Sequence, residues 1–518
     1  MKKRITFTIA ILLCAALLAG CGCAPTKPQQ QHAVYKEGGT GVISLPLTYF
    51  DTFNPVLTQS ETVLDAMMLV YDSLYRRGAD GQMQPLLAAQ TEVSADGLTY
   101  TLHLRNDVRW HNGDMFSAYD VSYTLAAIAA AESSQLKGCL SGIAAHTAKS
   151  NFVYEFTLVE PNSCFIDQLD FPVIRRGTDC TAVQADYVPM GTSAYYYIDT
   201  DRSRAHILGK NQNCTTVVAG AIEEIVLKEI PAADNLMYAL ESREVEAVHV
   251  DTKQLRTYSA KGNVTTVPYV NRNFTFLGMK AEGALADKQV RRALSLILDR
   301  DAIKTNAMFG RFVPSTLPFV PGSNINPMDE TQPAEDAATL LTAAGYAQTS
   351  EGTWQTETEE GVQNLSVSIL VNADNEVRCA AAEEIAKQFK AFGIGVSIDK
   401  TDFETYTMRV DAREYNMFLG ETLLATNLDV SAFVGIWARF ASPVGQNMDT
   451  LLYNARAAVT PEDKETAFLA LADAISDEVP VISVGFGQNA VIINDRIDGE
   501  ICPVYQNIYC DFALWDAA

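Results

Sequence analysis

The sequence predicts an α/β protein built from several domains, and two observations lead to that prediction. The chain has 518 residues, which at roughly 150 residues per domain corresponds to about two to four domains. Segments in which apolar and polar residues alternate, as they do in strands, are interspersed with segments whose apolar residues recur at helical spacing. In the second half a helical segment is followed by a strand-like one, which is typical of sheets covered by helices.

Strands are predicted in the first half where apolar residues alternate with polar ones, at 100–104 and 154–158. Each of these segments can bury one face and expose the other. The segment 107–113 is expected to be a turn. Asp120 is then expected to cap or open a helix through the alanine-rich residues 121–131.

Helices are predicted in the second half from their spacing and their ends. Asp287 is expected to be the N-cap of a helix in which apolar residues between Val290 and Leu298 recur at helical spacing. Two later helices are expected to end at Gly345 and Gly393, because glycine is favoured just past a helix C-terminus. A strand is expected to follow at 395–398.

Composition and charge narrow the range of functions. Apolar residues make up 48% of the chain and charged residues 20%, as in soluble globular proteins. Acidic residues outnumber basic ones by 63 to 39, so the net charge is −24. Such a surface repels phosphate backbones, and we therefore expect no nucleic-acid partner.

The N-terminus determines the expected compartment. Lys2–Arg4 form a short basic start, residues 5–18 are apolar or small, and the letters LAGC end at Cys21. This lipobox pattern predicts a lipoprotein signal peptide over residues 1–20, with Cys21 receiving the lipid and becoming the new N-terminus. The alternative is a single-span anchor with Cys21 as a buried apolar residue, although the apolar stretch is short for a membrane span. Residues 21–37 are expected to form a flexible tether.

We therefore expect the mature chain at the extracytoplasmic face of a bacterial cell membrane, lipid-anchored in the periplasm or at the cell surface. Export permits disulfides, and of the ten cysteines Cys502 and Cys510 are spaced to close a small loop. Pairing cannot be deduced from sequence alone. The chain has no Cys-x-x-Cys motif, so a zinc ribbon or a thioredoxin-like site is not supported.

Searches for catalytic motifs give no catalytic residue, metal ligand or cofactor site. The chain contains no HExxH, no GxSxG and no P-loop. Residues 485–490 match GxGxxA, but 490–493 have the pattern of a strand where a dinucleotide site needs a helix. Acid pairs such as Asp299/Asp301 and Glu383/Glu384 are expected to cap or solvate helices.

An ordered series of motifs runs through residues 71–125. It comprises a Tyr-x-x-Leu, a Pro-x-Leu-Ala, an Asp-Gly-x-x-Tyr-x-x-x-Leu-Arg, a Trp-x-Asn-Gly and an Ala-x-Asp-Val, which begin at Tyr71, Pro85, Asp96, Trp110 and Ala118. The series closely resembles the signature region of the peptide/nickel class of ABC-transporter solute-binding proteins, the dipeptide- and oligopeptide-binding family (extracellular solute-binding proteins, family 5). Further matches follow in order at 191–195, 239–246, 287–294, 299–300 and 340–346.

The resemblance implies a periplasmic-binding-protein-like α/β fold of the three-lobed flytrap type, in which two lobes joined by a two-strand hinge close over a ligand. It places lobe I at 35–59, 190–270 and 482–518. An inserted small lobe is expected at 60–189, and lobe II at 271–481.

The signature residues themselves are expected to be mainly structural. Asp96 and Gly97 are expected to form a type I′-like hairpin turn. Arg105 and Asp120 are expected to tie a loop by hydrogen bonds and charge, and Trp110 is expected to lie in the core.

The resemblance also suggests ligand contacts in lobe II. Family members that take peptides bind them extended through main-chain hydrogen bonds, with an acidic residue holding the α-amino group. The matching stretch is 419–430, in which Asp429 stands at the position of that acid and Glu421 is a further candidate. The stretch lacks the aromatic residue and the proline of the family pattern, and the alternative is that Asp429 caps a helix starting at Val430.

Three aromatic residues complete the predicted ligand site. Tyr49 and Phe53 belong to a loop that resembles the cleft-facing loop of the family, and both are candidates to pack ligand side chains. Packing in the core is the alternative for Phe53. Trp437 follows the candidate loop of lobe II and is a candidate to line the cleft.

The function implied is that of a monomeric, lipid-anchored binding protein without enzymatic activity. It would capture an oligopeptide or dipeptide and deliver it to a membrane permease and its ATPase. The first alternative is a protein of the same family that binds nickel, a metal chelate or another small solute. The second is a surface hydrolase that uses a pair of cleft carboxylates.

Overall fold

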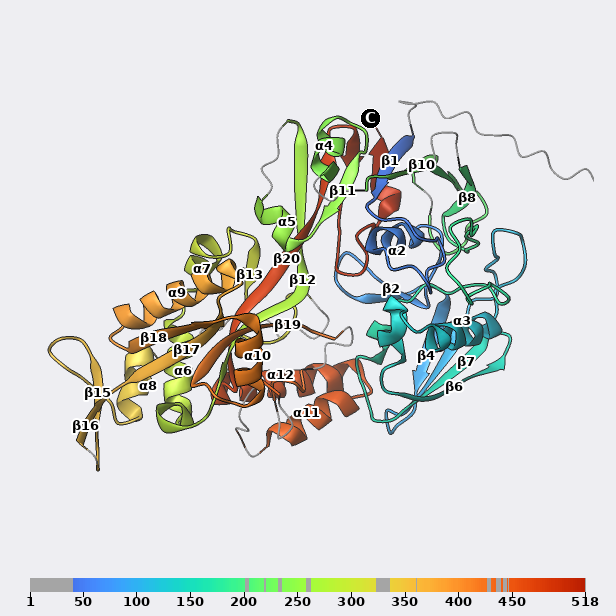
Figure 1. The fold of residues 1–518 in the computed structure, drawn as a ribbon. Helices are drawn as coiled ribbons and strands as arrows, with labels where there is room; N and C mark the ends of the chain where they lie inside the picture. The colour runs from blue at the N-terminus through green and yellow to red at the C-terminus, as the bar shows by residue number, and fades with distance from the viewer. Residues whose placement is uncertain are drawn as a thin grey trace, which may run out of the picture.

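The computed structural model describes residues 41–517, apart from 201–204, 219, 232–234, 258–261, 323–335, 360, 426–429, 435–438, 441–444 and 446. The predicted signal peptide, Cys21 and the tether therefore lie outside the described residues, and so do Asp429 and Trp437. Within them the chain forms an α/β protein whose two large bodies are joined by two long strands (Figure 1). None of the described helices is long and apolar enough to cross a membrane.

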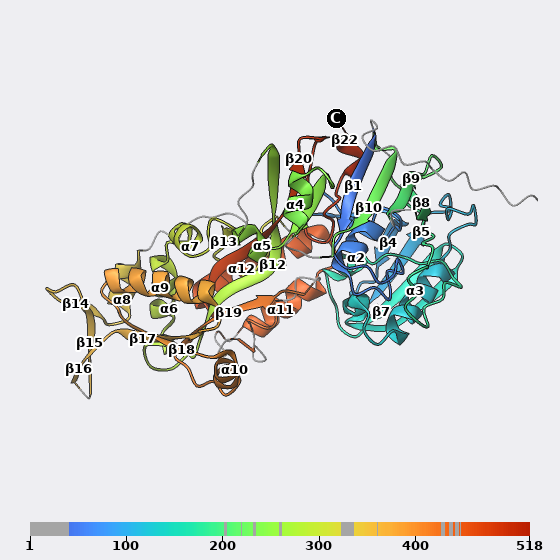
Figure 2. The same cartoon turned by 45° about the horizontal axis from the view of Figure 1, so that its top comes forward.

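The first body contains a four-stranded sheet in the order β1-β10-β9-β8. Its strands are β1 (Val42–Leu47), β10 (Glu224–Glu229), β9 (His206–Lys210) and β8 (Tyr195–Thr200). β1 runs parallel to β10, and the other two pairs are antiparallel. The same body contains α2 (Glu61–Met67) and α4 (Leu236–Glu241), and the chain ends beside β1 with the pair β21 (Ile497–Gly499) and β22 (Trp515–Ala517) (Figure 2).

A second antiparallel sheet, in the order β4-β5-β7-β6, forms the small lobe within this body. Its strands are β4 (Ala88–Val93), β5 (Thr99–Leu104), β7 (Val153–Leu158) and β6 (Ile143–Ser150), and the short pair β2 (Tyr75–Arg77) and β3 (Met83–Pro85) precedes them. Both strands predicted from alternation are present, and in each the alternate residues are buried. α3 (Ala118–Ala130) packs on this sheet.

Two local predictions in the small lobe need correction. The helix N-cap is Ser117, and Asp120 is the third helical residue, whose carboxylate accepts from the Ser117 backbone N–H in a capping box. The turn at Asp96-Gly97 is not of type I′, because only Gly97 has a positive φ, at 69°. The Gly97 N–H donates to the Ser94 carbonyl instead, which leaves glycine at the left-handed position after the turn. Trp110 is buried, as predicted.

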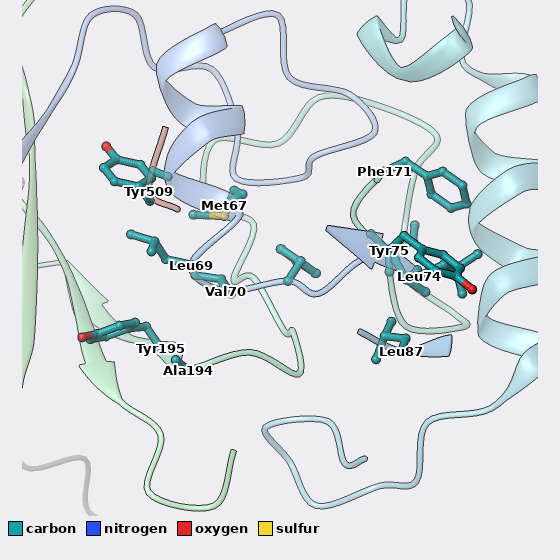
Figure 3. Close-up of a cluster of buried hydrophobic side chains, with 14 of the residues drawn as sticks. Met67, Leu69, Val70, Leu74, Tyr75, Leu87, Phe171, Ala194, Tyr195 and Tyr509 are labelled. Carbon is teal, nitrogen blue, oxygen red and sulfur yellow. The ribbon is translucent and has the colours of Figure 1, made fainter. Parts of the chain in front are cut away.

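One hydrophobic core runs through both sheets of the first body. Figure 3 shows part of it, with Met67, Leu69, Val70 and Tyr195 near the first sheet and Phe171 near the small lobe. Because buried side chains pack at crystal-like density, a continuous core of this kind resists internal shear. The first sheet and the small lobe therefore share one hydrophobic core.

The two long strands are β12 (Val264–Met279) and β20 (Val481–Asn494), and they are the two-strand hinge of the predicted flytrap fold. Their sheet has the order β11-β20-β12-β19-β17-β18, and β13 also pairs with β20; its other strands are β11 (Ala247–Val250), β13 (Phe312–Pro314), β17 (Ser366–Asn372), β18 (Gly395–Thr401) and β19 (Met417–Leu423). One end of the β12–β20 pair packs beside β11, and the other end belongs to the core of the second body (Figure 1). β20 continues as a strand through the GxGxxA segment, which confirms that this motif opens no helix.

Helices cover the sheet of the second body. They are α6 (Lys288–Ile297), α7 (Arg300–Asn306), α8 (Ala337–Ala343), α9 (Glu376–Ala391), α10 (Phe403–Asp411), α11 (Met448–Ala457) and α12 (Pro461–Glu478). The side chain of Asp287 accepts from the Gln289 N–H, which confirms it as an N-cap. Gly345 and Gly393 follow α8 and α9 with φ of 84° and 94°, as the sequence predicts.

Smaller elements complete the described chain. A three-stranded sheet of β14 (Ala347–Gln348), β15 (Trp354–Thr358) and β16 (Gly361–Asn364) projects from the second body (Figure 1), and α5 (Thr252–Thr257) follows β11. Short 3-10 helices span Gln135–Leu140, Phe165–Gln168, Gly283–Ala286 and Phe512–Leu514. The described cysteines, including Cys502 and Cys510, have free thiols.

Candidate functional site

A cavity of about 220 Å³ lies where the first body meets the hinge. Its wall combines the turn between β2 and β3, the middle of β12, the segment after β13 and the C-terminal segment before β22. Its lining residues include Arg77, Asp80, Tyr269, Arg272 and Tyr505. Because the wall draws on the hinge strand as well as on the first body, bending at the hinge changes the shape of this cavity.

Arg77 is fixed in the wall by a buried ion pair. Its Nη2 lies 2.9 Å from Oδ1 of Asp167, and the two side chains are 8% and 2% exposed. Its Nη1 donates to the Gly81 carbonyl at 2.8 Å, which shapes the turn after β2. The Asn507 side chain donates to the Arg77 carbonyl, also at 2.8 Å, and so ties the C-terminal segment to the same strand.

Arg272 enters the wall from an irregular point of β12. The pairing of β12 with β20 shifts register between Val270 and Phe274, and such a shift re-aims the intervening side chains. The Arg272 guanidinium carbon lies 4.1 Å from the centroid of the Tyr505 ring, and its Nη2 donates to the Tyr505 hydroxyl. A cation over an aromatic face is attracted by the ring quadrupole. Burial lowers the pKa of Arg272.

Asp170 lies close to both arginines without forming an ion pair with either. Burial raises the pKa of its carboxyl to about 6, against the lowering effect of the Arg77 and Arg272 charges. Its Oδ2 has no hydrogen-bond partner among the described residues. At neutral pH a carboxyl group with this pKa is mostly ionised, so Asp170 offsets part of the positive charge of the two arginines.

A polar chain connects the cavity to the first body through the hinge. The Tyr269 hydroxyl lies 2.8 Å from Nε2 of His249 on β11. Nδ1 of His249 lies 3.9 Å from Oδ2 of Asp65 on α2. Burial lowers the pKa of His249 to about 4 and raises that of Asp65 to about 7, with Glu61 adding to the latter shift. His249 is therefore neutral at physiological pH and holds Tyr269 by a hydrogen bond between uncharged groups.

The two bodies also touch away from the hinge. The Ser163 hydroxyl donates to the Ala455 carbonyl at 2.7 Å, and Nζ of Lys464 donates to the Ser163 carbonyl at 3.2 Å. Cys164 packs in the hydrophobic cluster of the second body, although it belongs to the small lobe. Glu160 and Arg456 form an ion pair at 3.2 Å beside this contact. The small lobe thus docks on α11 and α12 (Figure 2).

The structure separates the sequence-predicted ligand residues that it describes. Tyr49 is 60% exposed on the first body. Phe53 is 1% exposed and packs its ring on Phe50 and His206, as in the core-packing alternative. Glu421 lies on β19, 3.5 Å from Arg378. None of the three lines the described cavity, and their roles in binding stay predictions, as do those of Asp429 and Trp437.

The cavity residues were missed from the sequence for different reasons. A charged residue inside the largely apolar segment 269–279 was a usable signal for Arg272, because a buried strand rarely accepts an unpaired charge; the segment also contains two asparagines and a threonine. Tyr505 and Arg77 give no comparable signal, since only the fold brings the C-terminal segment to β2. Within the described part of the chain, no three His, Cys, Asp or Glu side chains gather as a metal-ligand set.

Comparison with known proteins places this geometry in context. Residues 82–441 match the family model described as bacterial extracellular solute-binding proteins, family 5 Middle. The oligopeptide-binding protein OppA of Bacillus subtilis is 22% identical, and the match covers 98% of this chain and 99% of OppA. Among solved structures, the unliganded open form of the periplasmic murein tripeptide-binding protein MppA gives a TM-score of 0.78 at 16% identity, covering 93% of this chain and 99% of MppA. A nickel ABC transporter protein from Bacillus halodurans gives 0.76 at 18% identity, covering 92% and 100%.

Proposed function

Since this chain belongs to family 5 of the bacterial extracellular solute-binding proteins, we propose that it is a lipid-anchored member whose cargo is a short peptide. Members of this family are the substrate-binding components of ABC importers and act outside the cytoplasm. What we propose beyond family membership is that the cargo is a short peptide and that a lipid anchors the protein. It also keeps the lobe boundaries expected from the sequence, at 35–59, 190–270 and 482–518 for lobe I, 60–189 for the small lobe and 271–481 for lobe II.

The observation that supports a peptide as the cargo is that one cavity is lined by residues of opposite charge. Arg272 and Asp80 both line it, together with Tyr269, Pro503 and Tyr505. A short peptide carries an ammonium group at one end and a carboxylate at the other, with apolar atoms between them. Each end therefore finds an opposite charge, and the rings offer apolar surface to the middle.

Capture requires no chemistry by the protein itself. A ligand that contacts both bodies favours the closed arrangement by its differential affinity for it. β12 and β20 give the closure a defined axis, because among the described residues these are the strands whose backbone runs from one body into the other. The closed form is then delivered to the permease, and its ATPase supplies the energy for transport.

The anchor rests on the lipobox that ends at Cys21. A lipid-modified N-terminal cysteine holds a protein stably when more than one acyl chain inserts. Residues 21–37 would tether a monomer close to the permease. In a cell that makes the full chain, Cys21→Ala should move the protein from the membrane fraction to the soluble exported fraction. Retention of the variant in the membrane would remove the anchor from the proposal.

A metal chelate is the second candidate, and one observation favours it. The Arg272 side chain of the cavity wall can bind a carboxylate of an organic chelator as well as one of a peptide. The nickel ABC transporter protein from Bacillus halodurans has a similar fold. A bare divalent cation is less suited to this wall, because Arg272 lines it without an ion-pair partner within 4 Å among the described residues and repels positive charge.

Native mass spectrometry of the protein lacking residues 1–23, purified without refolding, tests the cargo. A ladder of added masses that matches short peptides is the expected result and gives their length range. A single added mass with a metal isotope pattern would show that the cargo is a metal chelate instead of a peptide.

A labelled peptide incubated with the protein should stay intact. Its hydrolysis would support the alternative that the protein is a surface hydrolase. Asp429→Ala should weaken peptide binding if that residue holds the α-amino group; unchanged affinity would remove it from the site.

A further inference from the structure

A chain of three polar side chains runs from α2 of the first body to the cavity wall. Its members are Asp65 on α2, His249 on β11 and Tyr269 on β12, and Tyr269 is also a lining residue of the cavity. We propose that this chain is a relay, in which the protonation of Asp65 sets the tautomer of His249 and so decides whether the Tyr269 hydroxyl donates to cargo. The cargo here is the peptide on which the proposed function rests; the relay itself belongs to the protein alone.

A backbone N–H fixes the direction of the hydrogen bonds around the Tyr269 hydroxyl. The Asn273 N–H donates to Oδ1 of Asn271 at 2.9 Å, so it is Nδ2 of Asn271 that donates to Oδ1 of Asn489 at 2.8 Å. Asn489 therefore turns its Nδ2 towards the Tyr269 hydroxyl oxygen, to which it donates at 3.4 Å. The oxygen of Tyr269 is an acceptor on this side, and its hydrogen must be donated elsewhere.

His249 decides where that hydrogen goes. Its Nε2 lies 2.8 Å from the Tyr269 hydroxyl oxygen, and a neutral imidazole carries one hydrogen, on Nδ1 or on Nε2. With the hydrogen on Nδ1, Nε2 accepts from the Tyr269 hydroxyl. With the hydrogen on Nε2, the Tyr269 oxygen accepts from both His249 and Asn489, and the hydroxyl hydrogen is left for a group in the cavity.

The charge of Asp65 selects between these two tautomers. Its Oδ2 lies 3.9 Å from Nδ1 of His249. An ionised carboxylate at this distance favours a hydrogen on Nδ1, whereas a protonated carboxyl can offer its own hydrogen to Nδ1, directly or through a bridging water. The change takes up one proton from solvent, which ends on Asp65, and the imidazole hydrogen moves from Nδ1 to Nε2. Because the Asp65 side chain is 22% exposed, solvent protons can reach it.

The ionisable groups around the chain place this change near neutral pH. Burial and the charge of Glu61 raise the pKa of Asp65 to about 7. Burial lowers the pKa of His249 to about 4, against the opposing effect of Asp251, so the imidazole stays neutral in this range. The phenols that also face the chain are those of Tyr505 and Tyr509, and burial raises the pKa of both.

The relay makes cargo binding depend on pH. Below about pH 7 the Tyr269 hydroxyl donates into the cavity and can bond a carbonyl oxygen of a peptide. Above this pH the same carbonyl oxygen meets a lone pair of Tyr269 instead. Tyr269 is 8% exposed, and a buried hydroxyl without an acceptor is unfavourable, so the peptide bond gained at low pH should raise affinity about threefold to tenfold.

The ring ¹⁵N chemical shifts of histidine report its tautomer and test the relay without cargo. In histidine-labelled protein lacking residues 1–23, His249 should change from the Nε2–H to the Nδ1–H form between pH 6 and 8, and His249→Gln identifies its signals. Asp65→Asn should abolish the change, and Glu61→Gln should move it to lower pH. Asp251→Asn is the matched control, because it removes the other acid that acts on His249, and it should keep the change.

Cargo binding is measured with a library of tripeptides with free termini, by native mass spectrometry from solutions at pH 6 and pH 8. Peptide amino groups also titrate in this range, so each change is compared with that of Asp65→Asn, for which the peptides titrate alike. Wild type should bind about threefold to tenfold more tightly at pH 6 than at pH 8, beyond the change seen with the variant. Tyr269→Phe, which keeps the ring and loses the hydroxyl, should behave as Asp65→Asn does. Thermal unfolding confirms that each variant is folded.

Each contrary result bears on a distinct statement. A His249 tautomer that stays constant from pH 6 to 8, or a change that persists in Asp65→Asn, would overturn the relay. Equal pH dependence of binding in wild type and Asp65→Asn would overturn the role of Tyr269 in cargo specificity. Failure of wild type to bind any tripeptide, with the tautomer change present, would overturn the peptide function and leave the relay standing.

Discussion

The backbone N–H of Ser163 donates a 2.8 Å hydrogen bond to the carbonyl of Arg456, which joins the small lobe to α11 of the second body. The two bodies are therefore connected at two separated places, at the hinge strands and at this contact. A wide opening of the cleft bends the first connection and must break the second. The Ser163 contact is thus positioned to set how often the empty protein opens.

Weakening this contact should favour the open form. Ser163→Ala combined with Lys464→Met removes the hydroxyl bond to Ala455 and the ammonium bond to Ser163, each worth about 1 kcal/mol. The radius of gyration of the ligand-free variant, measured by small-angle X-ray scattering, should increase. Thr466→Ala, which removes a hydroxyl bond within α12, serves as the control. A double variant with the wild-type radius would show that the contact does not limit opening.

Asp170 should make the protein less stable as the pH rises. Its pKa is about 6 in the folded protein against 3.8 for an ordinary aspartate, so the folded state binds more protons than the unfolded state between these values. The free energy of unfolding therefore falls as pH rises from about 4 to 6, by on the order of 2–3 kcal/mol. Asp170→Asn should lack this decline. Urea unfolding at several pH values measures it, and parallel curves for the two proteins would contradict the assignment.

His249 should make the protein more stable as the pH rises, over a pH range similar to that of Asp170. Its pKa is about 4 when folded and 6.5 ordinarily, so here the unfolded state binds more protons. The stability contributed by the neutral imidazole is complete above pH 6.5 and is lost as the pH falls towards 4. His249→Gln should be less sensitive to acid than the wild type in the same urea titration. A steeper acid loss in the variant would show that the imidazole is not held neutral.

Gly485 is the position of β20 that should tolerate a side chain least. Its φ is 152°, and a Cβ there would collide with the Val313 carbonyl of β13. Gly485→Ala should lower the free energy of unfolding by about 1–3 kcal/mol. Gly138→Ala is the control, because a Cβ there meets no atom and the backbone conformation is ordinary. Equal stability of the two variants in urea would contradict the close approach of β13.

The sequence predicted those parts of the fold that depend on neighbouring residues. Alternation at Tyr100–Leu104 and the N-cap at Asp287 are local signals, and both elements formed where expected. The turn at Asp96-Gly97 was predicted with the wrong type, because a dipeptide does not reveal which φ values its strands impose. The family motifs gave the overall architecture through resemblance.

The site was harder to predict because its residues are distant in sequence. Arg77 and Tyr505 meet only after the C-terminal segment has returned to β2. Phe53 was a candidate for ligand packing, yet the first body buries it against His206. The sequence alone does not show whether an aromatic residue in a loop lies on a binding surface or in a core, since both environments favour the same side chain.

The register shift that holds Arg272 also limits how this protein can change its cargo. A substitution there alters the cavity wall and the pairing of the two hinge strands at once, because Arg272 lines the cavity and lies within the register shift. New specificity at this position would come with a new rate of opening and release. Variation in cargo should therefore be found more easily along the rest of the cavity wall, where a side chain can change without altering the pivot.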